Sequence, residues 1–183
     1  SVVGQGSRFE VRLPASESAA ADPPRRDAAA QSAAESAAGA RVLVIDDEPL
    51  VGRVVRGILA GCRVELASSG RAGRERIAAG ERFDVILCDL MMPGADGLRI
   101  LEETKEYCPD AVFCLVTGYA TTDSAVAALR KGVYDYLTKP LDLDDLLSTV
   151  QRALEHRALV TQNKRLIEGL REKLYEAMLA YSA

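Results

Sequence analysis

The stretch Phe83-Asp84-Val85-Ile86-Leu87-Cys88-Asp89-Leu90-Met91-Met92-Pro93-Gly94 is an apolar run that ends in a carboxylate and then a Pro-Gly turn. The run has little polar alternation, which is typical of a parallel strand covered on both faces. Sheets of this kind bind their ligands at the carboxyl ends of the strands. We therefore predict a buried strand that brings Asp89 to the ligand-binding edge of a sheet.

Four more short apolar runs surround this stretch, at residues 42–45, 62–67, 111–116 and 134–137. Each run is followed by turn residues and then by a helical pattern, such as Ala125, Val126 and Leu129 on one face after Thr121. Strands that alternate with helices through short connections form right-handed crossovers in a parallel sheet. We predict an α/β, flavodoxin-like (βα)5 doubly wound sheet with the order 2-1-3-4-5, followed by an extended C-terminal helix.

Composition and charge indicate which kinds of binding partner to expect. The formal charge of −4 is spread along 183 residues, so we expect no nucleic-acid or membrane surface in this fragment. The four cysteines lack paired metal-ligand spacing and fit reduced, buried thiols of a cytosolic protein. No apolar stretch is long enough to span a bilayer. We expect a cytoplasmic location, with any membrane anchor of a parent protein outside this chain.

Carboxylates end two of the predicted strands. Asp46 and Asp47 follow the first strand, and Asp89 ends the third, which places all three at the crevice where the winding of the sheet reverses. An acidic pair after a strand is also a common helix cap. Three carboxylates at one edge repel one another unless a cation joins them. Ligands that are all oxygen, with no His or Cys nearby, point to a hard ion and favour Mg2+.

Two further strand ends add complementary groups. Lys139 follows the fifth strand and provides a cation, and Thr117 ends the fourth strand with a hydroxyl beside Gly118. Either residue alone fits an ordinary surface or strand-end position. Together with Asp89 and a metal ion they supply the nucleophile, cation and hydroxyl that phosphoryl transfer to an aspartate requires.

Five motifs in the same order resemble one known family. They are Asp46-Asp47, Asp89-Leu90-Met91-Met92-Pro93, Thr117-Gly118, Tyr136 and Lys139-Pro140. With them, residues 41–155 resemble the receiver domain of two-component response regulators. The resemblance implies that Asp89 accepts a phosphoryl group from a phosphohistidine of a sensor kinase or phosphotransfer domain. It also implies that Asp47 binds Mg2+ directly, Asp46 mainly through water, and Met91 through its backbone carbonyl.

The same resemblance assigns roles to the remaining motif residues. Lys139 would hold a phosphoryl oxygen, and Thr117 would move toward the phosphate so that Tyr136 turns inward. The Lys139-Pro140 bond would be cis. Met91 and Tyr119 occupy positions that tune hydrolysis of the acyl phosphate in this family. From the residues alone, Tyr136 fits a core position equally well.

The N-terminal residues differ in character from the rest. Residues 1–14 contain Gly4-x-Gly6-Ser7-x-Phe9 and alternating apolar residues, and they resemble the last glycine box and strand of a histidine-kinase ATP-binding domain. Residues 15–40 have the Ala, Ser, Glu and Pro composition of a flexible linker. We therefore expect a piece of a hybrid sensor kinase. Without the rest of a nucleotide site, it would be a phosphoacceptor and not a turnover enzyme.

The last predicted helix continues beyond the domain. Apolar residues recur every seven positions at Leu146, Ala153, Val160, Ile167, Leu174 and Tyr181. Over residues 156–183 this pattern favours a parallel homodimer through a coiled coil, with Asn163 as a polar position that sets register. A single amphipathic helix lying on the domain fits the same pattern. His156, the only histidine, fits a structural or solvent-exposed helix position.

Three other functions fit part of the sequence. The chain fits a stand-alone response regulator, a dimerisation scaffold that is never phosphorylated, and a Mg2+-dependent phosphatase with an aspartyl intermediate. Phosphatases that resemble haloacid dehalogenases carry Asp-x-Asp on the first strand, whereas here Asp46-Asp47-Glu48 ends that strand. The candidate nucleophile lies instead on the third strand.

Overall fold

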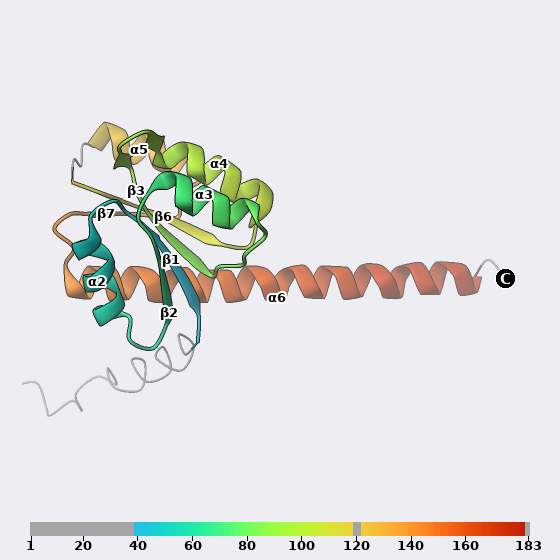
Figure 1. The fold of residues 1–183 in the computed structure, drawn as a ribbon. Helices are drawn as coiled ribbons and strands as arrows, with labels where there is room; N and C mark the ends of the chain where they lie inside the picture. The colour runs from blue at the N-terminus through green and yellow to red at the C-terminus, as the bar shows by residue number, and fades with distance from the viewer. Residues whose placement is uncertain (1–38, 119–121, 182–183) are drawn as a thin grey trace, which may run out of the picture.

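The computed structural model describes residues 39–118 and 122–181. Five parallel strands form one sheet in the order β2-β1-β3-β6-β7 (Figure 1). Their bounds are β1 (Arg41–Ile45), β2 (Arg63–Ala67), β3 (Val85–Asp89), β6 (Val112–Thr117) and β7 (Asp135–Thr138). Counted along the sheet alone, this is the predicted order 2-1-3-4-5, so the flavodoxin-like fold is confirmed.

Helices cover both faces of the sheet (Figure 1). One apolar core joins the sheet to α2 and α6, and the other joins it to α3, α4 and α5. The first four of these helices each lie in one crossover between parallel strands, as the alternating pattern predicts, whereas α6 follows the last strand. The bounds are α2 (Pro49–Ile58), α3 (Gly70–Ala78), α4 (Gly97–Tyr107), α5 (Thr122–Arg130) and α6 (Leu143–Tyr181).

Strand β3 lies in the middle of the sheet, and all five of its residues are buried. Val85 and Leu87 pack into the core under α2 and α6, whereas Ile86 and Cys88 pack into the core under α3 and α4. Full burial of one such aliphatic side chain contributes about 1.5–3 kcal/mol. The continuous apolar run is thus the consequence of a strand with no solvent-facing side.

The chain leaves β3 through a short hairpin that the sequence does not predict. Two-residue strands, β4 (Met91–Met92) and β5 (Ala95–Asp96), pair antiparallel around the turn at Pro93 and Gly94. Gly94 has a φ of +71°, a conformation that side chains other than glycine rarely adopt. Oδ1 of Asp96 then accepts the N–H of Leu98 at 2.9 Å and caps α4.

Helix α6 is continuous over 39 residues and confirms the extended C-terminal helix. Its first turns bury Leu146 and Ala153 against the sheet, and its later turns project past the sheet into solvent (Figure 1). Arg157 pairs with Asp84 at 2.7 Å and fixes the helix where it leaves the domain. The residues of the predicted seven-residue repeat are therefore buried in the domain core at Leu146 and Ala153, and they are exposed from Val160 onward.

Some predictions lie outside the described residues. These are the kinase-like segment 1–14, the linker up to residue 38, and Tyr119. The predicted cis bond between Lys139 and Pro140 is present. Within 39–118 and 122–181, no helix is both long enough and apolar enough to cross a membrane.

Candidate functional site

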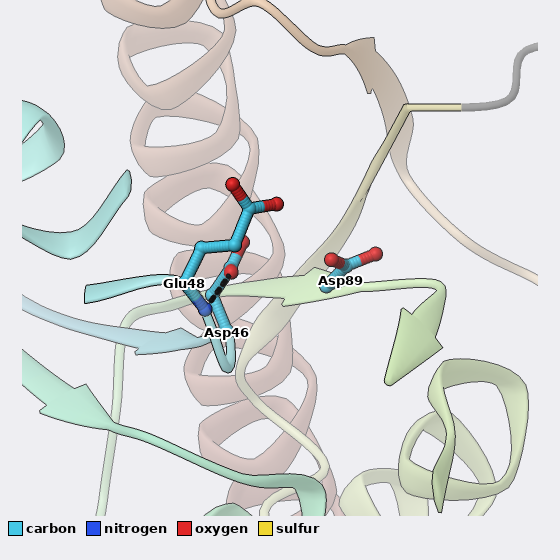
Figure 2. Close-up of side chains that lie close together, drawn as sticks. All are labelled: Asp46, Glu48 and Asp89. Atoms are coloured by element: carbon cyan, nitrogen blue, oxygen red, sulfur yellow. Dashed lines mark hydrogen bonds between the residues drawn. The ribbon is translucent and has the colours of Figure 1, made fainter. Parts of the chain in front are cut away.

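Three carboxylates converge at the carboxyl ends of β1 and β3 (Figure 2). Asp46 directly follows β1, Glu48 lies two residues later, and Asp89 is the last residue of β3. One oxygen from each of them lies within 4.8 Å of the other two. Asp46 and Asp89 are buried, and Glu48 is exposed. A compact acidic group thus lies where the winding of the sheet reverses, which is the position that the fold predicts for a ligand site.

Lys139 neutralises part of this group from the end of β7. Its Nζ lies 2.7 Å from Oδ2 of Asp89, 2.9 Å from Oδ2 of Asp46 and 2.8 Å from Oε1 of Glu48. Burial alone would lower the pKa of Lys139, but hydrogen bonds to the carboxylates outweigh it and raise the pKa above its ordinary value. One ammonium thus faces three carboxylates, which exceed its charge by two when all three are ionised.

The carboxylate of Asp46 is only partly satisfied. Oδ1 accepts the backbone N–H of Glu48 at 2.8 Å (Figure 2). Oδ2 is buried and has no aligned hydrogen bond, although Nζ of Lys139 lies 2.9 Å away as an ion pair. Burial raises the pKa of Asp46 above its ordinary value, and Lys139 only partly offsets this effect. Oδ2 is thus a buried acceptor with capacity for a further cation, which fits a Mg2+ ligand.

Asp89 is held in one orientation. Its Oδ1 accepts the backbone N–H of Met91 at 2.9 Å, and its Oδ2 accepts from Lys139 at 2.7 Å. The backbone around it is also fixed, because the N–H of Leu90 donates to the carbonyl of Val116 at 2.8 Å. A side chain held in this way loses little further freedom when a reaction partner arrives.

Thr117 and Lys139 meet at adjacent strand ends. Thr117 is fully buried at the end of β6, and its carbonyl accepts the N–H of Lys139 at 2.7 Å. Tyr136 lies on β7 opposite Leu115 and packs partly buried against the core under α3 and α4. The structure therefore brings the predicted strand ends of Asp46, Asp89, Thr117 and Lys139 to one edge of the sheet.

The acidic group at this edge includes one residue that was not predicted and omits one that was. Asp47 is exposed and is not among the three described carboxylates that converge, whereas Glu48 is. Glu48 was missed because helix N-termini commonly carry acidic residues without a site. Met91 is 67% exposed, and its backbone N–H donates to Oδ1 of Asp89. The ligand role of the Met91 carbonyl stays a prediction.

Comparison with known proteins places this arrangement in a family. Residues 42–151 match the sequence model of the response regulator receiver domain. Transcriptional regulatory protein ZraR of Escherichia coli O157:H7 is 38% identical over 122 residues, which cover 65% of this chain and 27% of that protein. The chain spans about a quarter of the length of the first curated relatives that it matches.

Solved structures agree with the sequence match. A response regulator receiver domain protein from Clostridium thermocellum superposes with a TM-score of 0.60 at 31% identity, covering 66% of this chain and 98% of that one. The beryllofluoride-activated NtrC4 receiver domain dimer gives a TM-score of 0.60 at 35% identity, with coverages of 64% and 98%. With more than half of its residues matched, the chain belongs to the response regulator receiver domain family.

Proposed function

We propose that Asp89 is the phosphoacceptor of this receiver domain and takes its phosphoryl group from the phosphohistidine of a sensor kinase or phosphotransfer domain. The observation that carries this proposal is the placement of Asp89 itself. It ends the central strand β3, its Oδ1 accepts the backbone N–H of Met91, and its Oδ2 accepts a hydrogen bond from Lys139. Its strand end faces the ligand edge of the sheet.

The reaction requires no redox partner. An oxygen of the Asp89 carboxylate attacks phosphorus, a P–O bond forms and the P–N bond to the imidazole breaks. The leaving nitrogen keeps the electron pair of that bond. The ammonium of Lys139, already 2.7 Å from Asp89, would pair with a phosphoryl oxygen, and the hydroxyl of Thr117 would donate to another. Later hydrolysis returns the carboxylate and releases phosphate.

Mg2+ fits the acidic group. The two excess negative charges and the unaligned Oδ2 of Asp46 provide the hard oxygen ligands that this ion prefers. Asp46, Asp89 and the Met91 carbonyl would hold it, and the ion would neutralise charge on the transferred phosphoryl group. The family resemblance alone supports a direct contact from Asp47, which lies exposed beside the group.

Phosphorylation would bias a two-state element formed by β6, α5 and β7. Thr117 would move toward the phosphoryl group, and Tyr136, which is partly buried on β7, would turn inward. The position of these two residues supports this proposal, because Thr117 lies on β6 and Tyr136 lies on the neighbouring strand β7, which leads to Lys139. The switch itself is inferred from the family.

The projecting part of α6 supports homodimerisation. Ile167 and Leu174 are each 63% exposed, and Leu170 is 67% exposed, all on the face that carries the seven-residue repeat. β-Branched residues at Val160 and Ile167 with leucine at position 170 favour a two-stranded coiled coil. The similar NtrC4 receiver domain is described as a dimer, which agrees with this proposal without testing it.

Two kinds of full-length protein fit this chain. Residues 1–14 support a hybrid sensor kinase, whereas the curated relatives that match include transcriptional regulators such as ZraR, DctD and NtrC. The second candidate is therefore a stand-alone response regulator. Either parent would place this domain in the cytoplasm, because that is where phosphohistidine donors act. Sequencing the gene on both sides of this segment distinguishes them.

The phosphoacceptor is tested by labelling with acetyl phosphate and Mg2+, followed by intact mass spectrometry. Wild-type protein should gain one phosphoryl group, and Asp89→Asn should gain none. Asp144→Asn makes the same change at an exposed position on α6 and should label as wild type. Undiminished labelling of Asp89→Asn would refute the proposal. Sustained turnover of small phosphate esters would support the phosphatase alternative, and absence of labelling in wild type would support the scaffold.

A further inference from the structure

Glu48 is the member of the acidic group to which the sequence analysis assigns no role. Its Oε1 lies 2.8 Å from Nζ of Lys139, yet its side chain is 62% exposed. Asp46 and Asp89, which share the same ammonium, are buried. Glu48 therefore combines a direct contact to the site lysine with a side chain that can turn into solvent without leaving a cavity.

The ammonium of Lys139 has three donor hydrogens and three carboxylate neighbours. A phosphoryl group on Asp89 brings new anionic oxygens that compete for the same donors. Glu48 is the neighbour that is released at the smallest cost, because water can solvate its exposed carboxylate. Once released, its negative charge remains on the solvent-exposed side of the acidic group, where it repels an anionic donor that approaches from solvent.

A metal ion responds to Glu48 in the opposite way. The additional carboxylate lies within 4.8 Å of the Asp46 and Asp89 oxygens and attracts a divalent cation toward them. Glu48 should thus strengthen metal binding and weaken the approach of an anionic phosphodonor.

We propose that Glu48 is a positioning residue of the phosphorylation site that shares Lys139 when no phosphoryl group is bound, strengthens Mg2+ binding, and slows entry of anionic phosphodonors. It acts through its charge and through Lys139 and makes no bond to the phosphoryl group. The inference rests on the proposed function, since both effects concern phosphoryl transfer to Asp89.

The first test is metal affinity in the full chain. Titration with Mn2+ followed by electron paramagnetic resonance, and then competition with Mg2+, measures binding without any turnover. Glu48→Gln should bind both ions about three- to tenfold more weakly, as expected for the loss of one exposed charge near a divalent ion. Glu48→Asp keeps the charge and should retain most of the affinity. Glu168→Gln removes the same charge from the projecting part of α6 and should bind as wild type.

The second test is the labelling rate with acetyl phosphate at saturating Mg2+. Glu48→Gln should label Asp89 about two- to fivefold faster than wild type, because less negative charge opposes the donor. A variant that merely disturbs the fold would lose both metal affinity and rate. Opposite changes in the two quantities are therefore the signature of the proposed role.

The inference is overturned if Glu48→Gln keeps wild-type metal affinity, if its labelling rate falls together with that affinity, or if wild-type protein binds neither ion. Labelling of Asp89→Asn is a separate measurement. Should that variant label normally, the proposed function fails, while the metal affinities of the Glu48 variants still report on the acidic group. The two failures are thus distinguishable.

Discussion

The ammonium of Lys139 lies 2.7 Å from Oδ2 of Asp89, although the two residues are 50 positions apart in the chain. Strand β6 lies between their strands in the sheet, so the Lys139 side chain reaches across the end of β6. Neighbouring strands lie about 4.8 Å apart, so β7 and β3 are separated by roughly twice this distance, and a long flexible side chain is needed to cover it. The backbone N–H of Lys139, bonded to the carbonyl of Thr117 at 2.7 Å, fixes where that reach begins.

Removing the cation should destabilise the domain and make it respond more strongly to Mg2+. Lys139→Met leaves Asp46 and Asp89 buried without their ammonium, which should cost about 2 kcal/mol in the free energy of unfolding. Urea unfolding with and without Mg2+ measures both quantities. Lys131→Met, which removes an exposed lysine after α5, should change neither. A Lys139→Met protein with unchanged stability would contradict the role given to this ion pair.

A methyl group at Gly97 should disturb the backbone of Asp89. A Cβ there would lie 2.6 Å from the carbonyl oxygen of Asp89 and 3.0 Å from Cα of Leu90, and neither backbone atom can move freely. Gly97→Ala should therefore reduce the free energy of unfolding by about 1–3 kcal/mol and slow labelling of Asp89.

The control is a helical glycine with open space around it. A Cβ at Gly57 in α2 meets nothing within 4 Å, so Gly57→Ala should leave labelling unchanged and stabilise the protein by up to about 1 kcal/mol. Thermal unfolding and mass spectrometry compare the two variants. Equal effects at the two positions would show that the close approach to Asp89 does not matter.

Stability should fall in acid through a network far from the phosphorylation site. Glu81 and Glu65 pair with both Arg41 and Arg76. The guanidinium groups of Arg41 and Arg76 lie 4.8 and 5.3 Å, respectively, from the centre of the Phe83 ring. Hydrogen bonds from Arg76 lower the pKa of Glu81. For Glu65, burial opposes the shift, but the two arginines prevail and its pKa is also lowered.

The direction of this pH dependence follows from the lowered pKa values of Glu65 and Glu81. Below the ordinary value of 4.5 the unfolded chain binds protons that the folded protein does not, so stability present above this value is lost as pH falls through the folded pKa values. Glu65→Gln combined with Glu81→Gln should flatten the pH dependence of urea unfolding below about pH 4.5. An unchanged acid slope would exclude these two carboxylates as its cause.

The coiled-coil proposal predicts a specific loss of assembly. Ile167→Glu places a charge on the exposed repeat face of α6 and should convert dimer to monomer in sedimentation velocity. Gln162→Glu adds the same charge on the same projecting helix, off the repeat, and should leave the dimer intact. A monomeric wild-type protein, with or without beryllofluoride, would rule out this role for the helix.

Sequence determined the architecture because the central strands of this sheet, β3 and β6, are buried along their whole length. A run such as Val85 to Cys88 stays apolar only when both faces are covered, and that condition implies a parallel sheet with crossover helices. The strand-end positions of Asp46, Asp89, Thr117 and Lys139 then follow from the topology. For these residues, local pattern and overall fold impose the same constraint.

Tertiary structure alone decided which partner each side chain meets. Period seven places Leu146 and Ile167 on one stripe of α6, but only the end of the sheet makes the first buried and the second exposed. Likewise Val126 and Leu129 share a predicted face, yet both are exposed and Ala128 is buried. Whether Asp47 or Glu48 joins the acidic group depends on how the chain turns after β1, which adjacent carboxylates in a sequence do not reveal. Burial by distant elements and the direction of a turn are properties of the folded chain, so the strand ends could be predicted and the contacts made there could not.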